Sequence, residues 1–364
     1  MAIARGAAHQ DGAWTVAVVG CGIGRGHIEG YKAHPDKFRV TALCDVDEGR
    51  LAATGDEFAI ARRTTSFDDL LGMEDVDIVD ICTPPALHVT QALAVLAAGK
   101  EVVCEKPVAG SLADIDRVIA AEGEAAGRVM PVFQYRFGDG VRKAKHVIDL
   151  GLAGTSYLAT VETAWRRTPE YYRTMWRGRL QSELGGVLLT HAIHSHDLLT
   201  YLMGPVASVF AHTATRINPV EVEDCAVASL VMQSGALASL AATLGSHREI
   251  SRLRLCFEQV TFESSLAPYS PGDDPWSIIP ASPTANDRIG NALAGYRSAQ
   301  SGFAGLMGAY HEALKTGGAL PVTLADARQS LELVTALYHS AATGSLVDLP
   351  IGRDHPRYSG WQAA

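Results

Sequence analysis

The short stretch Glu105-Lys106-Pro107 places an acid, a base and a proline side by side. The apolar residues before it, 102–104, are typical of the end of a buried strand, where charged side chains are unusual. Because proline lacks a backbone N–H and restricts the preceding residue, Lys106 is held in an extended conformation. A lysine fixed at a strand end can act on a proton of a bound substrate. The alternative is a structural ion pair between Lys106 and a neighbouring acid.

A second reactive stretch, residues 185–197, contains three histidines within six positions and ends in an acid. On one helix, His191, His194 and Asp197 would share a face. A histidine titrates near neutral pH and can take the proton of a substrate hydroxyl. We therefore consider His194 a catalytic candidate. Packed core histidines at the start of a helix are the alternative for His191 and His196.

The same three histidines could bind a metal ion. Their spacing at 191, 194 and 196 fits one helix poorly, and the sequence shows no second ligand cluster. We therefore expect no metal.

Residues 18–27, VVGCGIGRGH, follow the first apolar run and carry glycines at alternate positions. In the dinucleotide pattern G-x-G-x-x-G, glycines let the backbone approach a pyrophosphate at a helix N-terminus. The spacing here is imperfect, so a plain tight turn is the alternative. We expect this turn to bind a dinucleotide through Gly20, Gly22, Ile23, Gly24 and Arg25.

Asp45 ends the second apolar run, 25 positions after Gly20. An acid at this place binds the ribose 2′-hydroxyl and repels a 2′-phosphate, so NAD is favoured over NADP. The alternative is that Asp45 caps the helix starting near Glu48. Further residues at strand ends and beside them are expected to contact the cofactor: Thr83, Pro84, His88, Glu105 and Lys106.

Aromatic and basic residues crowd the segment 165–177. Such a cluster can be a solvated loop with a few packed anchors. It can also stack on a polyhydroxylated substrate and form hydrogen bonds with it. The substrate is expected to contact Lys106, Tyr135, Arg166, Tyr172, Trp176, Arg177, Thr190, His191 and His194.

The elements that must position these residues differ between the two parts of the chain. Residues 1–13 are expected to be a disordered tail. In residues 14–133, strands near 15–20, 39–45, 76–85 and 101–107 alternate with helices, including 86–100 and about 115–124. This alternation predicts a doubly wound parallel sheet, an α/β fold in which ligands bind at the carboxyl ends of the strands.

The second part, 134–364, predicts an α+β domain with an open, mostly antiparallel sheet. Strands are expected at 155–165, 206–216, 224–232, 236–244 and 252–263, with a hairpin turn at 233–235. Residues 264–302 are rich in turn-forming residues and are expected to form a long loop or extension. A closing helix is expected to begin with a capping box formed by Thr323 and Asp326.

Composition limits the partners. The net charge is −9 with acids and bases interspersed, which argues against nucleic acid and anionic membranes as partners. The six cysteines show no CxxC spacing and are typical of reduced thiols, so we expect a cytoplasmic protein. The apolar strands of the second part predict a homodimer or homotetramer.

These motifs, in this order, resemble the glucose–fructose oxidoreductase/inositol dehydrogenase (Gfo/Idh/MocA) family. The resemblance covers about residues 14–351 and rests on the glycine turn, CTPPALH, CEKP, WRG and GGVLL…HSHD. It implies an N-terminal Rossmann domain and an open-sheet C-terminal domain, with Lys106 at the nicotinamide and the substrate. It also implies that His194 is the histidine of the HxxD pattern and that Asp197 is its acid.

Two features of the sequence depart from the family pattern. The glycine loop is one residue shorter than the common form. Thr190 stands where many members carry an aspartate, so Lys106 and His194 act without it, or His191 replaces it.

The resulting functional hypothesis is an NAD-dependent oxidoreductase acting on a secondary alcohol of a sugar, sugar derivative or cyclitol. Its partner would be a small polyol substrate. One alternative is an NAD-dependent glycosidase that works by transient oxidation. The other is a catalytically silent protein that senses NAD or sugar.

Overall fold

The computed structural model describes residues 12–361, which form two compact units. The first unit contains the described residues up to Gly110, Asp114–Val132 and Phe303–Ala327, and the second contains Ser111–Ala113, Phe133–Gly302 and the described residues from Arg328 onward. The segment Phe303–Ala327 thus lies in the first unit, although the sequence analysis assigns it to the second. The expected tail, residues 1–13, lies outside the described residues except for Gly12 and Ala13.

The first unit contains a six-stranded sheet in which every neighbouring pair is parallel. In sheet order, its strands are β3 (Arg62–Thr64), β2 (Phe38–Cys44), β1 (Trp14–Val19), β4 (Ile78–Ile81), β5 (Glu101–Cys104) and β6 (Val129–Pro131). Strands β1, β4 and β5 consist mainly of buried apolar residues, as expected for strands covered on both faces, with Thr15, Asp80 and Glu101 as the polar exceptions. The chain order reverses between β1 and β4, which is where doubly wound sheets bind ligands. The predicted fold is confirmed.

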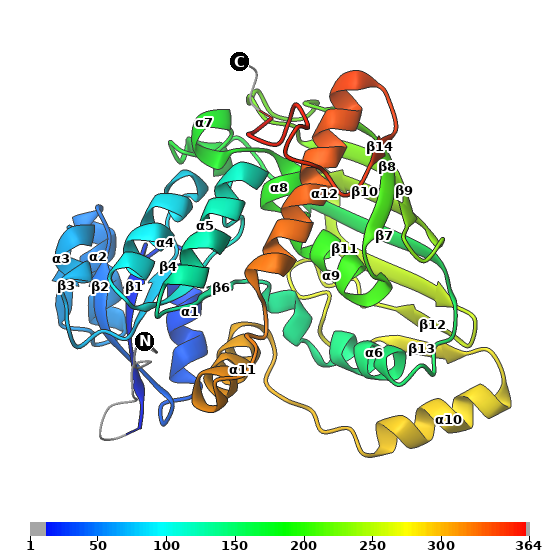
Figure 1. Ribbon diagram of the computed structural model, residues 1–364, viewed down its shortest axis with the longest axis horizontal. Coiled ribbons are helices and arrows are strands. Elements are labelled where there is room, and N and C mark those ends of the chain that lie inside the picture. Colours follow the sequence, from blue (N-terminus) through cyan, green and yellow to red (C-terminus); the bar gives the residue numbers. More distant parts are fainter. Residues whose placement is uncertain (1–11, 362–364) are drawn as a thin grey trace. The chain divides into compact units, whose positions relative to one another are not determined.

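Helices connect these strands. They are α1 (Gly24–Lys32), α2 (Glu48–Glu57), α3 (Phe67–Leu71), the short η1 (Pro85–Leu87), α4 (His88–Ala97) and α5 (Leu112–Glu124). Helix α11 (Gly302–Thr316) comes from late in the chain, and all of it except Gly302 also belongs to this unit. Figure 1 shows α4 and α5 side by side next to the strands. Asp47 and Ser66 cap α2 and α3 by accepting backbone N–H bonds. Gly99 has a φ of +73° just after α4, as its place in the sequence predicts.

The second unit contains an eight-stranded sheet. In sheet order, its strands are β13 (Ser277–Pro280), β12 (Val260–Glu263), β11 (Gly245–Phe257), β7 (Ser156–Arg166), β10 (Leu237–Thr243), β9 (Cys225–Met232), β8 (Val206–Ala214) and β14 (Val347–Asp348). Only the β7–β10 pair is parallel. The mostly antiparallel sheet is therefore confirmed, as is the turn at 233–235, where Gly235 has a φ of +86°.

The helices of this unit are η2 (Gln134–Phe137), α6 (Asp139–Asp149), η3 (Tyr171–Arg173), α7 (Leu180–Glu183), α8 (Val187–Thr190), α9 (Ile193–Met203), α10 (Pro283–Ala294) and α12 (Leu324–Thr343), whose first residues belong to the first unit. Helices α8 and α9 pack against the sheet. Along β9 and β10, buried and exposed residues alternate, so the opposite face of the sheet is exposed. The capping box of α12 forms as predicted, with Thr323 and Asp326 bonded to each other's backbone N–H.

The structure corrects two predictions for the second part. Residues 252–263 are not one strand, because the chain turns at residues 258–259 between β11 and β12. Residues 264–302 are not only a loop, since they contain β13 and α10. Helix α10 buries only Ala285 and Ile289, so its apolar spacing is too sparse to be recognised; Ser282 caps it and Pro283 occupies its first turn.

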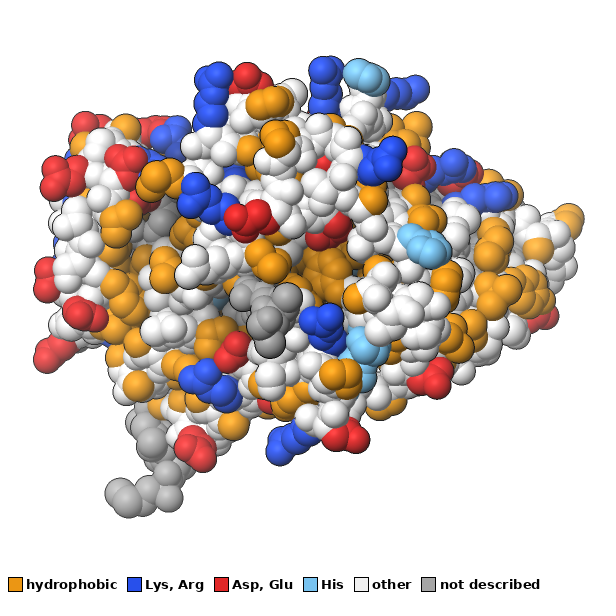
Figure 2. Space-filling view, turned by 90° about the horizontal axis from the view of Figure 1, so that it is seen from above, with side chains coloured by type: hydrophobic (Ala, Val, Ile, Leu, Met, Phe, Trp, Pro, Cys, Tyr) orange, Lys and Arg blue, Asp and Glu red, His pale blue; other side chains and the backbone are white. Residues whose placement is uncertain are grey.

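The described surface mixes acidic and basic side chains, as Figure 2 shows for one face. Within residues 12–361, no helix is both long enough and apolar enough to cross a bilayer.

Candidate active site

The glycine turn after β1 combines tight packing with an open edge. Gly20 has a φ of +95°, and a Cβ there would lie 2.5 Å from the carbonyl oxygen of Cys82. A Cβ on Gly24 would lie 2.8 Å from a methyl group of Val18. In contrast, a Cβ on Gly22 would meet nothing within 4 Å. The turn therefore packs tightly against β4 and keeps open backbone at Gly22 before the N-terminus of α1, which fits a dinucleotide pyrophosphate.

Two side chains on this turn were predicted to contact the cofactor. Ile23 is the N-cap residue of α1, and half of its surface is exposed. Arg25 pairs with Glu57 of α2. The structure thus leaves Ile23 available at the open edge and directs Arg25 toward α2.

Asp45 is buried and bonded to the glycine turn. One carboxylate oxygen accepts the Cys21 N–H at 2.8 Å, and the other accepts the Asp47 N–H at 2.9 Å. Asp47, not Asp45, caps α2, so the alternative role for Asp45 as the helix cap is wrong. The Arg50 Nε atom lies 3.2 Å from Asp45 and places a cation beside the acid.

The loops after β4 and β5 are joined by His88. Its ring nitrogens lie 2.7 Å from the carbonyl oxygens of Thr83 and Pro107. The Thr83 hydroxyl donates to Gln91 at 2.6 Å. His88 therefore holds Thr83, Pro84 and the Lys106-Pro107 segment in place, and both of its nitrogens are occupied by the protein.

Lys106 follows β5 directly, and its neighbour Glu105 is fixed from two directions. Glu105 is buried, with one oxygen 3.1 Å from His27 Nε2 and the other accepting the Lys106 N–H at 3.0 Å. The Glu105 side chain thus faces α1, where His27 lies. Lys106 is half-buried at the carboxyl end of the strand, where ligands bind in this type of sheet.

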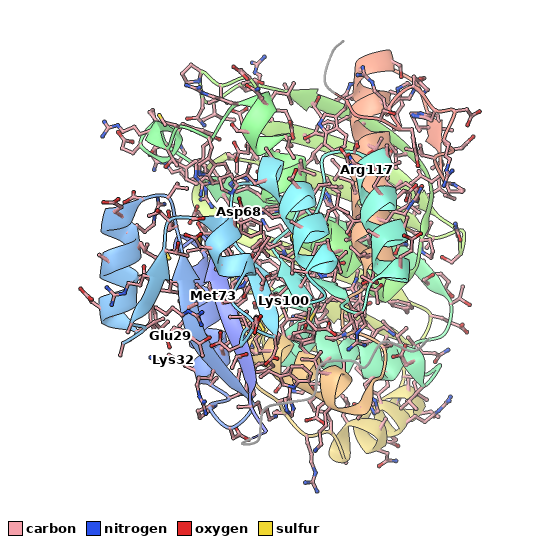
Figure 3. The ribbon with its side chains drawn as sticks, turned by 60° about the vertical axis from the view of Figure 1, so that its left-hand side comes forward. Glu29, Lys32, Asp68, Met73, Lys100 and Arg117 are labelled. Atoms are coloured by element: carbon pink, nitrogen blue, oxygen red, sulfur yellow. The ribbon has the colours of Figure 1, made fainter. Side chains whose placement is uncertain are left out.

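Lys100, just before the same strand, has a different role. Its ammonium group donates to the carbonyl oxygens of Met73 at 2.8 Å and Val76 at 2.7 Å (Figure 3). It satisfies backbone acceptors at the amino end of the sheet, far from the strand ends that carry ligand sites. Lys100 is a structural lysine and a matched reference for Lys106.

In the second unit, His194 lies on α9 and is buried among aromatic rings. Its ring stacks on Tyr135, with centroids 4.5 Å apart, and meets the edge of Phe133. One turn later, Asp197 forms a buried ion pair with Arg136 at 2.7 and 2.5 Å. Since Arg136 is adjacent to Tyr135, the Arg136–Asp197 ion pair keeps the Tyr135 ring stacked on His194. The sequence indicated His194 and Asp197 but gave no signal for Arg136.

His191 and His194 do not share one helix, which corrects the sequence analysis. Helix α8 ends at Thr190 and α9 begins at Ile193. The Thr190 hydroxyl donates to the Gly186 carbonyl, which also accepts the Thr190 backbone N–H. Thr190 Oγ1 also lies 2.7 Å from His191 Nδ1, and His191 Nε2 lies 3.2 Å from the Tyr171 hydroxyl. Thr190 therefore orients His191.

His196 is a packed core histidine, as the alternative interpretation proposed. It is completely buried, and burial lowers its pKa to about 3. The ring is therefore neutral. Among residues 12–361, the one group whose ligand atoms lie close enough for a metal is His27, Asp80 and Cys82, in the first unit.

The aromatic and basic segment forms a stacked cluster beside His191. The Arg177 guanidinium lies 3.9 Å from the ring centre of Tyr171 and 4.4 Å from that of Trp176. It also donates to the Tyr171 hydroxyl. Tyr172, Trp176 and Arg177 are half-exposed and can contact a ligand.

The second arginine of the cluster is Arg167, which the sequence analysis includes in the segment 165–177 but not among the expected substrate contacts. Arg167 lies over the rings of Trp165, Tyr171 and Tyr269 and pairs with Glu249 at 3.1 Å. The predicted Arg166 is instead exposed. Side chains alternate along a strand, and β7 ends at Arg166. The buried Trp165 next to it was the signal that Arg166 lies on the opposite face.

A carboxylate that the sequence did not reveal holds the GG turn before α8. Glu223 accepts N–H bonds from Gly186 and Leu188, each at 3.0 Å, and the Tyr338 hydroxyl at 2.8 Å. Burial raises the pKa of Glu223 to about 7. This residue positions the segment that carries Thr190 and His191.

Two family models match the chain. Residues 14–133 match the model described as "Oxidoreductase family, NAD-binding Rossmann fold", and residues 141–263 match the GFO/IDH/MocA C-terminal domain. The chain belongs to the GFO/IDH/MocA oxidoreductase family. Its first unit contains the family's NAD-binding Rossmann domain, which confirms the expected cofactor. The resemblance inferred from the EKP and HxxD motifs is confirmed as well.

Individual relatives agree with this assignment. The chain is 30% identical to the uncharacterized oxidoreductase YrbE of Bacillus subtilis over 61% of its own length and 64% of the relative's. It is 30% identical to the myo-inositol 2-dehydrogenase of Thermotoga maritima, over 61% and 66%. These matches span less than two thirds of the relatives' lengths. A solved structure of the WlbA dehydrogenase from Bordetella pertussis, in complex with NADH and UDP-GlcNAcA, matches with a TM-score of 0.82. That match has 31% identity and covers 93% of this chain and 98% of the other.

Proposed function

We propose that this member of the family is an NAD-dependent dehydrogenase. It would transfer hydride between a secondary alcohol of a sugar, sugar derivative or cyclitol and the nicotinamide. The observation that carries the proposal is Lys106, which follows β5 at the ligand-binding edge of the sheet, with its backbone N–H bonded to the buried Glu105. A lysine on a solvated loop would not need such a backbone anchor. The family assignment supports the same chemistry.

Oxidation of a secondary alcohol releases a hydroxyl proton together with a hydride. NAD, when bound, supplies the hydride acceptor. In this proposal, the open backbone at Gly22 accommodates the pyrophosphate, and Asp45 accepts a ribose hydroxyl. Lys106 Nζ or the His194 imidazole takes the substrate proton, and His191 is kept oriented by Thr190. Both candidate bases are therefore on elements with fixed backbones, as proton transfer requires.

Trp176 and Arg177 offer an aromatic face and a guanidinium, which suit the apolar faces and the oxygens of a polyol. The relatives named above suggest two probes of different charge: myo-inositol, which is neutral, and UDP-GlcNAcA, which carries a carboxylate and phosphates. The assay should include both.

The deciding experiment measures NADH formation by the full-length protein with NAD and a panel of polyols that includes these two compounds. Net NADH formation with any member supports the proposal. Cleavage of a glycoside without net NADH would indicate the glycosidase alternative. Binding of NAD and sugar in calorimetry with no turnover in either direction would contradict the proposal and favour a sensor.

A further inference from the structure

His27 is a completely enclosed ionisable group near the cofactor turn. It lies on α1 and has no exposed surface. Its Nδ1 atom lies 2.9 and 3.1 Å from the two oxygens of Asp80 on β4, and Nε2 lies 3.1 Å from Glu105 after β5. One ring therefore joins the helix after the glycine turn to the two neighbouring strands of the sheet.

The contacts define the charge of the ring. Both ring nitrogens face carboxylates, and only an imidazolium can donate from both. Desolvation by burial is the largest single effect and opposes this charge, but the attraction of Asp80 and the contacts with Cys82 together outweigh it, so the pKa of His27 is raised. The pKa of Glu105 is lowered despite desolvation, mainly through its bond to His27. The surrounding Cys82, Tyr31 and Tyr310 have pKa values raised by burial and are neutral.

The same facts argue for an ion cluster and against a metal site. Cys82 Sγ lies 3.4 Å from both His27 Nδ1 and Asp80, so a cation could in principle be shared by these three groups. A metal needs a thiolate and a neutral imidazole. Both nitrogens of His27 face carboxylates, so a ring that gave one nitrogen to a metal would leave one of these carboxylates without its donor. The imidazolium itself supplies the positive charge between Asp80 and Glu105.

The cluster is connected to Lys106 through a single residue. Glu105 contacts His27 with one oxygen and accepts the Lys106 N–H with the other. On the other side, the Phe303 ring packs on His27 with centroids 4.5 Å apart. A Cβ on Gly26 or Gly30 would come within about 3 Å of Phe303, so α1 packs closely on the start of α11. Helix α11 thus covers the ion cluster, which explains why this late segment belongs to the first unit.

We propose that His27 is a positioning residue: its imidazolium holds Glu105 in the orientation that fixes the backbone of Lys106. This inference rests on the proposed function of Lys106. Without the cation, Asp80 and Glu105 would be two buried carboxylates with no charge between them, and such groups protonate or turn away. Glu105 would then release the Lys106 N–H, and the lysine would lose its fixed direction.

The first test measures the charge of His27 directly and needs no substrate. Nitrogen NMR of the full-length protein labelled at histidine should show that the His27 ring is still an imidazolium at a pH where an ordinary histidine is neutral. The imidazolium signal is assigned to His27 if it is missing from the spectrum of the His27→Gln variant. A neutral tautomer at that pH would overturn the proposal, whatever the enzyme does.

The second test measures the consequence for Lys106. In His27→Gln, kcat should fall about tenfold to a hundredfold while KM and the NAD dissociation constant change little, because the variant misplaces a proton-transfer group. The loss should be smaller at lower pH, where protonation of Glu105 removes its repulsion from Asp80. Adding Asp80→Asn, which removes one of the two carboxylates, should restore part of kcat.

The matched control is His34→Gln. His34 follows α1, and its Nε2 lies 2.8 Å from the Ala304 carbonyl, so it joins the same two segments without touching Glu105. Its loss should lower the melting temperature and leave kcat and its pH profile unchanged. If folded His27→Gln behaves like His34→Gln, His27 is only structural and the proposal fails. If the wild-type protein shows no turnover but His27 is an imidazolium, the proposed function fails instead.

Discussion

At the scale of single residues, two lysines flank one strand and do different things. Lys100 donates to two backbone carbonyls before β5, whereas Lys106 follows the strand with its N–H bound by Glu105. The two side chains lie at opposite ends of β5. In a doubly wound sheet, only the carboxyl end carries ligands.

The first prediction compares these lysines. Lys106→Ala should fold normally, bind NAD and lose about a hundredfold to ten-thousandfold in kcat, the usual contribution of a positioned acid–base group. Lys100→Ala should lower the melting temperature, because it leaves two carbonyls without their donor, and should keep kcat. Steady-state kinetics and thermal unfolding of both variants decide. Near-normal kcat in Lys106→Ala would show that His194 transfers the proton alone.

The second prediction concerns Asp45 and the choice of cofactor. NAD should bind more tightly than NADP, because the carboxylate repels a 2′-phosphate. Asp45→Ala should reduce the ratio of the NADP dissociation constant to the NAD dissociation constant by about tenfold to a hundredfold. Arg50 lies 3.2 Å from Asp45 and would remain as a cation available to the phosphate. Titration calorimetry with NAD and with NADP measures the two dissociation constants for the wild-type protein and the variant.

Arg50→Ala provides the control for that experiment. It removes the cation beside Asp45 and should widen the preference for NAD. Equal dissociation constants for NAD and NADP in the wild-type protein would contradict the prediction.

At the scale of elements, the second unit depends on carboxylates that hold turns. Glu223 fixes the GG turn and α8 through two backbone N–H groups and Tyr338. Its pKa is raised to about 7 by burial, so the protonated form favours the folded state. The resulting stability is fully present below the ordinary pKa of a glutamate and is lost as the pH rises through about 7.

The third prediction is the loss of stability with rising pH that the raised pKa of Glu223 implies. The free energy of unfolding should decrease by at most about 3 kcal/mol between pH 5 and pH 8 through Glu223. Glu223→Gln should flatten this slope, and Tyr338→Phe should steepen it, because it removes a donor that favours the carboxylate. Urea unfolding at several pH values is the measurement. If the free energy of unfolding of Glu223→Gln decreased with pH as steeply as that of the wild-type protein, a group other than Glu223 would cause the pH dependence.

The elements also show what the sequence could predict. Strands β1, β2, β4 and β5 of the first unit were recognisable because continuous apolar runs end in glycine, acid or proline. Strands β3 and β6 were missed, since each has only three residues. Helix α11 was missed because glycines interrupt its apolar spacing, and it is stabilised by burying Leu306, Met307 and Tyr310. The break between α8 and α9 left no signal in the apolar spacing of the sequence.

Some residues of the candidate site could be predicted from the sequence, and others could not. Lys106, His194 and Asp45 were indicated by a charge at the end of an apolar run or by an unusual residue spacing. Arg136 and Arg167 were not, since their roles depend on partners far away in the sequence, Asp197 and Glu249. His27 and Asp80 left a weaker signal: each is a polar residue inside an otherwise apolar or glycine-rich pattern.

At the scale of the whole molecule, the exposed face of the eight-stranded sheet carries a row of apolar side chains. Leu158 of β7, Leu237 of β10 and Val231 of β9 are paired in register across three neighbouring strands. Their exposed fractions are 41%, 55% and 38%. A continuous apolar row in the middle of a sheet is typical of an interface.

The last prediction is that this face joins copies of the chain into a homodimer or homotetramer. Light scattering at micromolar concentration should give a mass of at least two chains. Leu237→Glu places a carboxylate at the centre of the row, between Leu158 and Val231. It should dissociate the assembly, because a charge buried without a partner costs several kcal/mol. Leu150→Glu is the control, since Leu150 is equally exposed, at 54%, but follows α6 away from the row. A monomeric wild-type protein would contradict the prediction, and an intact assembly in Leu237→Glu would place the interface on another surface.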